Sequence, residues 1–160
     1  MCRVQFSERM TTPERKPRIE LDPTTTEQYA ETFLSRREFY PRQADNGSYF
    51  VVEKPLHTGV VMAHLRGIMT IGAYALDSDN QAKWLCFDAD SPERWQQLTE
   101  LAHDLTEQHV TPYLEASRRG GHLWLFTAPT VAPDIRRFGK QLLSEHDISD
   151  VELYPKQDKL

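Results

Sequence analysis

A chain of 160 residues is long enough for one domain to bury its own hydrophobic core without disulfides or a structural metal. Its formal net charge of −5 at pH 7 argues against a uniformly basic nucleic-acid-binding protein. The two cysteines, Cys2 and Cys86, have neither a disulfide framework nor zinc-site spacing, so a reducing, cytoplasmic location is expected. No apolar run could span a membrane, and the N-terminal segment lacks the apolar core of a signal peptide, so no membrane partner is expected.

The excess of acidic side chains is concentrated in the middle of the chain. Residues 48–110 carry nine acidic and four basic side chains, whereas the flanking segments are balanced. The acidic side chains of this segment include Asp77, Asp79, Asp88 and Asp90. A site that collects divalent cations would account for part of the excess, and a solvated acidic face is the alternative that charge alone favours.

The N-terminal segment is predicted to differ from the rest of the chain. Residues 1–23 contain several prolines and no apolar period, which predicts a poorly ordered lead-in to a domain over residues 24–160. A helix is predicted to begin at Thr24, because Thr24 and Glu27 form a capping-box pattern, and to end before Pro41.

The remaining elements follow from turn residues and apolar periodicity. Strands are predicted at residues 48–52, 69–75, 83–87, 111–116, 122–126 and 151–154. Helices are predicted from Thr58, as a cap, to Gly67, from a Ser91 cap through Leu105, and around Ile135, Phe138 and Leu142. The polar residues 77–80 would join two of the strands as an antiparallel hairpin. This order predicts an α+β fold, a mainly antiparallel sheet with helices packed on one face.

Two carboxylates follow the apolar run of residues 85–87. Because side chains alternate along a strand, Asp88 and Asp90 are expected on the same side, about 6 to 7 Å apart. Carboxylates are hard oxygen ligands suited to Mg²⁺ or Mn²⁺, and a pair of such ions can assist phosphoryl transfer. An aspartate before a helix can also be only an N-terminal cap, so both interpretations of Asp90 stay open.

The loop of residues 117–122 combines several kinds of phosphate ligand. Gly121 and its neighbour free backbone N–H groups to approach an anion, Arg118 and Arg119 supply charge, and Ser117 and His122 can donate hydrogen bonds. A triphosphate would fit such a loop, and the alternative is a flexible hairpin loop with solvated arginines.

The last strand carries an acidic side chain among apolar neighbours. Glu152 would be costly to bury unpaired, so it is either on the exposed face or a ligand. Lys156, just beyond the proline that ends the strand, could reach a phosphate or be solvated.

Together these three segments resemble, in order and spacing, the motifs of the archaeo-eukaryotic primase superfamily. The resemblance is closest to the branch of TOTE-type conflict systems and CRISPR-associated primase-polymerases, and it covers roughly residues 40–159. It extends to the short segments at residues 64–67, 70–74, 120–124 and 153–157. The resemblance implies an RRM-like catalytic sheet and a DNA primase/polymerase activity that transfers nucleotides to a 3′-hydroxyl on a primed nucleic-acid template.

The resemblance also implies roles for individual residues. Asp88, Asp90 and Glu152 would be the catalytic carboxylates that hold two Mg²⁺ or Mn²⁺ ions, while Ser117 and His122 would grip the triphosphate of a nucleoside triphosphate. Arg118 and Arg119 would contact phosphate or template, and helicase or nuclease domains are expected in the same system.

Two departures from these relatives bear on the expectations. Residues 53–60 lack the cysteine-rich insertion that members of this branch often carry, so no zinc is predicted. The chain ends three residues after Gln157, where relatives usually continue, so a C-terminal truncation of the catalytic core is an open expectation. A metal-dependent nuclease and a non-catalytic nucleotide- or nucleic-acid-binding module of a larger defence or mobile-element protein are the alternative functions.

Overall fold

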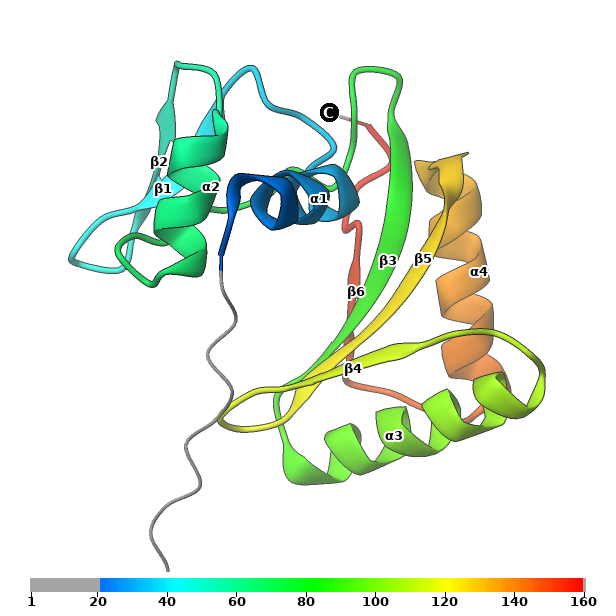
Figure 1. The fold of residues 1–160 in the computed structure, drawn as a ribbon. Coiled ribbons are helices and arrows are strands. Elements are labelled where there is room, and N and C mark those ends of the chain that lie inside the picture. The colour runs from blue at the N-terminus through cyan, green and yellow to red at the C-terminus, as the bar shows by residue number, and fades with distance from the viewer. Residues whose placement is uncertain (1–20, 160) are drawn as a thin grey trace, which may run out of the picture.

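The computed structural model describes residues 21–159 (Figure 1). The predicted lead-in falls almost wholly outside the described residues. In chain order the elements are α1 (Pro23–Phe33), β1 (Tyr40–Gln43), β2 (Tyr49–Val52), α2 (Thr58–Leu65), β3 (Gln81–Ala89), α3 (Pro92–Glu107), β4 (Tyr113–Ala116), β5 (Gly121–Val131), α4 (Ala132–Glu145) and β6 (Glu152–Tyr154). Among the described residues, no helix is both long and apolar enough to cross a membrane.

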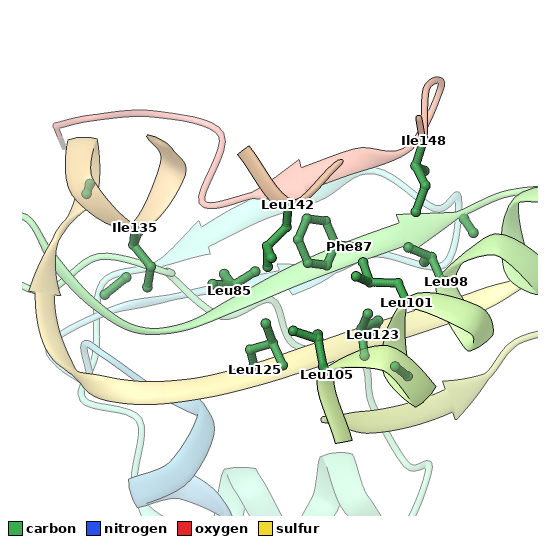
Figure 2. Close-up of a cluster of buried hydrophobic side chains, with 14 of the residues drawn as sticks. Leu85, Phe87, Leu98, Leu101, Leu105, Leu123, Leu125, Ile135, Leu142 and Ile148 are labelled. Carbon is green, nitrogen blue, oxygen red and sulfur yellow. The ribbon is translucent and has the colours of Figure 1, made fainter. Parts of the chain in front are cut away.

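A four-stranded antiparallel sheet in the order β4-β5-β3-β6 forms the centre of the molecule. Helices α3 and α4 pack on one of its faces, and the predicted α+β fold is confirmed. The side chains buried between sheet and helices form one apolar cluster (Figure 2), which includes Leu85, Phe87, Leu98, Leu101, Leu105, Leu123, Leu125, Ile135 and Leu142. Since Leu85 and Phe87 point to the helices, their neighbours along β3 point to the other face.

Helix α3 begins where the sequence predicts it. The side chain of Ser91 accepts a hydrogen bond from the backbone N–H of Arg94 at 3.3 Å, and Pro92 occupies the first helical turn. The apolar residues at helical spacing, Leu98, Leu101 and Leu105, are all buried. This helix directly follows β3, so its cap fixes the position of the chain immediately beyond Asp88.

The N-terminal elements form a second packed unit. Helices α1 and α2 and the β1–β2 hairpin share a separate apolar cluster that includes Ala30, Leu34, Tyr40, Leu56, Val61 and Ile71. Figure 1 shows α1 on the side of β3 opposite α4. The indole N–H of Trp84 donates to the backbone oxygen of Phe33 at 3.0 Å, and Nζ of Lys83 donates to that of Leu34 at 3.0 Å. These bonds hold the end of α1 against the second face of the sheet.

Two predicted helix caps are wrong. Helix α1 begins at Pro23, and Asp22 rather than Thr24 is its cap, with the Asp22 carboxylate accepting from the N–H of Thr25 at 2.7 Å. An aspartate is at least as good a cap as a threonine. In helix α2 the cap position is held by His57, whose side chain makes no capping hydrogen bond, and Thr58 is the first helical residue. The hydroxyl of Thr58 instead donates to Glu27 at 3.0 Å, which ties α2 to α1.

The predicted strand at residues 69–75 and its hairpin with the next strand are also wrong. Only one isolated bridge, Arg42 with Ile71, forms there. The segment lies beside β1 through two backbone bonds, from Gly72 N–H to Pro41 O and from Gln43 N–H to Thr70 O. The proline in β1 has no N–H to donate, so a regular ladder cannot continue through it. The long strand β3 pairs instead with β5 and β6.

Candidate active site

One row of side chains crosses all four strands of the sheet on the face opposite α3 and α4. In register, Glu115 of β4 pairs with His122 of β5, His122 pairs with Asp88 of β3, and Asp88 pairs with Glu152 of β6. Directly opposed residues on antiparallel strands point to the same face and lie about 5 Å apart at Cβ. The fold therefore assembles two of the predicted carboxylates and the predicted histidine in one line.

An aromatic row lies next to this polar row. Tyr113, Trp124, Cys86 and Tyr154 are register partners across the same four strands. Together with α1, α2 and the segment after α2, this face borders a half-open cavity of about 640 Å³ whose lining includes Phe33, Trp84, Phe126 and His64. Asp88 and His122 line the same cavity. It therefore has an aromatic interior and a polar edge.

His122 lies between two carboxylates. Its Nε2 is 3.4 Å from Oδ1 of Asp88, and its Nδ1 is 3.0 Å from Oε2 of Glu115. The same Oε2 accepts the indole N–H of Trp124 at 3.0 Å. The Asp88 side chain retains 26% of its accessible surface, so it can reach both the histidine and solvent.

Glu152 is paired with its own strand end rather than with Asp88. Its Oε2 accepts from the hydroxyl of Tyr154 at 2.9 Å and from Nζ of Lys156 at 2.8 Å. The hydrogen bond from Lys156, followed by that from Tyr154, holds the pKa of the Glu152 carboxyl below its usual value. In return, the bond to Glu152 raises the pKa of Lys156. The side chain of Lys156 is thus placed beside a predicted metal ligand.

Asp90 lies one residue beyond the end of β3. It is not the cap of α3, because Ser91 fills that role. Its side chain is 71% exposed and pairs with the guanidinium of Arg119 at 3.1 Å. The capping interpretation of Asp90 is therefore wrong, and its carboxylate is exposed to solvent apart from the pairing with Arg119.

The loop between β4 and β5 is tightly folded against the end of β3. The backbone N–H of Ser117 donates to Gly120 O at 2.9 Å, and the N–H of Gly120 donates to the Ser117 hydroxyl at 3.2 Å. A Cβ on Gly120 would lie 1.9 Å from the backbone oxygen of Ala89, and one on Gly121 would lie 2.6 Å from both Glu115 O and the Trp95 ring. Close packing alone therefore accounts for both glycines. Arg118 is exposed on the same loop.

The family model described as the TOTE conflict system, archaeo-eukaryotic primase domain, matches residues 21–160. The chain belongs to this primase domain family. The comparison with curated proteins found no match. The resemblance of the short motifs is thereby confirmed over nearly the whole chain, and it supports a function of the primase and polymerase class.

The carboxylates of this primase domain offer oxygen donors of the kind that Mg²⁺ and Mn²⁺ prefer. Within residues 21–159, no three His, Cys, Asp or Glu side chains converge closely enough to hold a metal ion. Each predicted ligand is instead paired with a side chain that can carry positive charge: Asp88 with His122, Asp90 with Arg119 and Glu152 with Lys156. The backbone register of Asp88 and Glu152 fits a shared cation, because the two residues lie directly opposite each other.

The sequence interpretation missed Glu115 in this primase domain. It lies two residues before the loop and looks like an exposed charge on a short strand. The signal that could have found it is the hairpin register: once Ala116 pairs with Gly121, Glu115 must face His122. The loop length therefore specified the pair, although composition and periodicity did not.

Proposed function

We propose that this primase domain is a nucleotidyltransferase that adds nucleoside triphosphates to a 3′-hydroxyl on a primed nucleic-acid template. The observation that carries the proposal is the row of Asp88, His122 and Glu152 at the edge of an aromatic cavity, on a chain that the family match covers. Nucleotide transfer needs three parts: carboxylates for the metal ions, a loop with ligands for the phosphates, and a cavity for the base.

On this proposal Asp88, Asp90 and Glu152 hold two Mg²⁺ or Mn²⁺ ions. Such ions would supply positive charge to the oxygens at which negative charge develops during phosphoryl transfer. Each carboxylate would have to turn from the side chain that now neutralises it, His122, Arg119 or Lys156. Those three basic side chains would then be free for the phosphates of the nucleotide, which explains why cationic and anionic groups alternate at this site.

The nucleotide would lie with its phosphates over the row and its base in the cavity. Ser117, Arg118 and Arg119 extend from the loop beside the row, and Gly121 brings the backbone close to it. A volume of about 640 Å³ falls in the range of small-ligand sites. Aromatic rings such as Trp124 and Phe126 suit a planar base, because stacking on an aromatic ring tolerates any base.

Catalysis in this arrangement rests on positioning and charge rather than on acid-base chemistry by the carboxylates. Asp88 sits on a strand that pairs on both sides, and its neighbours along β3, Phe87 and Ala89, are almost fully buried. Such a rigid strand fixes the backbone of Asp88, so that only its side chain has to turn towards the metal ions while the flexible side chains of the loop adjust to the phosphates.

Extension of a labelled DNA primer on a template, with Mg²⁺ or Mn²⁺ and nucleotides, tests the proposal. The wild-type domain should extend the primer, and the double variant Asp88→Ala/Asp90→Ala and the chelated wild type should not. Cleavage of the nucleic acid without extension would indicate a nuclease. Nucleotide binding that the double variant retains, with no turnover, would indicate a binding module, and either outcome would overturn the proposal.

A further inference from the structure

We infer that Glu115 is a positioning residue for His122, and that the aromatic packing of Trp124 in turn fixes Glu115. The inference rests on the proposed function, because it gives His122 the nucleotide as its ligand. It adds a residue that no sequence motif identified and a line of contacts that leads from the cavity wall to the polar row.

The first step is the bond between Glu115 and His122. An ionised carboxylate can only accept hydrogen bonds, so the imidazole nitrogen at 3.0 Å from Oε2 must carry a proton. The other ring nitrogen, Nε2, lies 3.4 Å from Oδ1 of Asp88. By holding Nδ1 on the side of β4, Glu115 orients the ring so that Nε2 points at Asp88 and the edge of the cavity.

The second step is the anchoring of Glu115 itself. The side chain is 61% exposed, and an isolated carboxylate on an edge strand would sample several rotamers. Here the indole N–H of Trp124 donates to the same Oε2 at 3.0 Å. Two donors on one oxygen restrict the carboxylate to the rotamer that faces His122.

The third step is the rigidity of Trp124. Its ring packs edge-on against Trp84, with centroids 5.2 Å apart, and against Phe33 of α1, with centroids 5.4 Å apart. It also contacts the His122 ring edge-on at 5.9 Å. Packing by rings from two sides fixes the direction of the indole N–H. The wall of the cavity therefore sets the orientation of the Glu115 side chain, and Glu115 in turn sets that of His122.

Kinetics separate this role from a general structural one. Glu115→Ala should raise the nucleotide concentration for half-maximal rate about tenfold, the scale of one lost hydrogen bond, and change kcat much less. His122→Ala should raise this nucleotide concentration by at least the same factor. The double variant should be no worse than His122→Ala alone, since the two residues act through one contact. Glu115→Gln, which keeps an acceptor oxygen, should restore most of the wild-type value.

The matched control is another glutamate that faces a histidine. Glu107 lies 3.6 Å from His103 on the exposed surface of α3, on the helix-covered side of the sheet. Glu107→Ala should leave the nucleotide dependence as in the wild type. Additive losses in the Glu115 and His122 double variant, or an unchanged nucleotide dependence in Glu115→Ala, would overturn the inference.

Hydrogen exchange at the His122 ring, followed by NMR, keeps the inference testable without activity. The Nδ1–H of His122 should exchange with water more slowly in the wild type than in Glu115→Ala, because Glu115 accepts its hydrogen bond. Equal exchange in both proteins would overturn the positioning role. The expected difference in a domain that extends no primer would uphold the contact and overturn only the proposed function.

Discussion

Asp88 and His122 are register partners on adjacent strands, and their side chains approach to 3.4 Å between Oδ1 and Nε2. The carboxylate therefore has a polar neighbour within the protein, and its partial exposure lets water solvate it as well. Such a group contributes to ligand binding more than to folding, because neither its burial nor its pairing is complete.

Replacing Asp88 by Asn should abolish primer extension and leave the fold intact. The amide keeps the shape of the side chain but cannot neutralise a divalent cation, so a loss on the order of a hundredfold or more in kcat/KM is expected. Melting should stay cooperative and close to the wild-type temperature. Glu100→Gln, the same kind of change on the exposed face of α3, controls for loss of one charge. Loss of cooperative melting in Asp88→Asn would show that the residue is structural.

The pairing of Lys156 with Glu152 should make stability depend on pH in a defined window. The lowered pKa of Glu152 means that its stabilisation is present above the ordinary value of 4.5 and is lost as the pH falls through the folded-state pKa. The raised pKa of Lys156 means that its stabilisation is present below 10.5 and is lost as the pH rises through its own folded-state pKa.

The melting-temperature difference between the wild type and Lys156→Met should therefore be largest between these two values. The difference in melting temperature should become smaller below the lower value and above the higher one. Thermal melts of both proteins across a pH series measure this difference. Lys140→Met, which removes an exposed lysine from α4, controls for the change in net charge. A difference that does not vary with pH would mean that the methylene groups of Lys156, rather than its charge, stabilise the protein.

The sequence predicts the elements that carry local signals and misses those that depend on distant partners. Helix α3 was predicted because Ser91, Pro92 and the leucine spacing all agree. The strand predicted at residues 69–75 does not form, because strand propensity says nothing about whether Pro41 on the neighbouring strand can donate a hydrogen bond. Phe138 fits the apolar period of α4 but is 44% exposed, since it lies at the edge of the buried stripe.

In the candidate site, too, the sequence predicts features with local signals and misses those that depend on distant partners. The carboxylates and His122 could be found because their residue types and spacing are unusual. The cavity beside them could not, because its rings come from α1 and from all four strands of the sheet, which are spread over most of the described chain. The pairing of Glu152 with Lys156 likewise depends on how the chain turns after β6.

Gly120 should be required for the loop to pack against β3. A Cβ would lie 1.9 Å from the Ala89 oxygen, so Gly120→Ala must displace the loop that carries Arg119. We expect a loss of about 1–3 kcal/mol in stability and a higher nucleotide KM. In Gly59→Ala the new Cβ would meet only the flexible side chain of His57, at 3.1 Å, so little change is expected. Equal melting temperatures for the two variants would contradict the close approach.

Phe87 should contribute far more to stability than Phe138, although both lie in regular elements on the helix-covered side. The ring of Phe87 is fully buried, and Figure 2 shows it among the leucines of the core, whereas Phe138 is 44% exposed. Phe87→Ala should cost about 3–5 kcal/mol, because it removes a ring that the packed neighbours cannot replace. Phe138→Ala should cost about 1 kcal/mol or less. Urea denaturation of both variants measures the difference, and similar losses would mean that the sheet and helices do not form the core described.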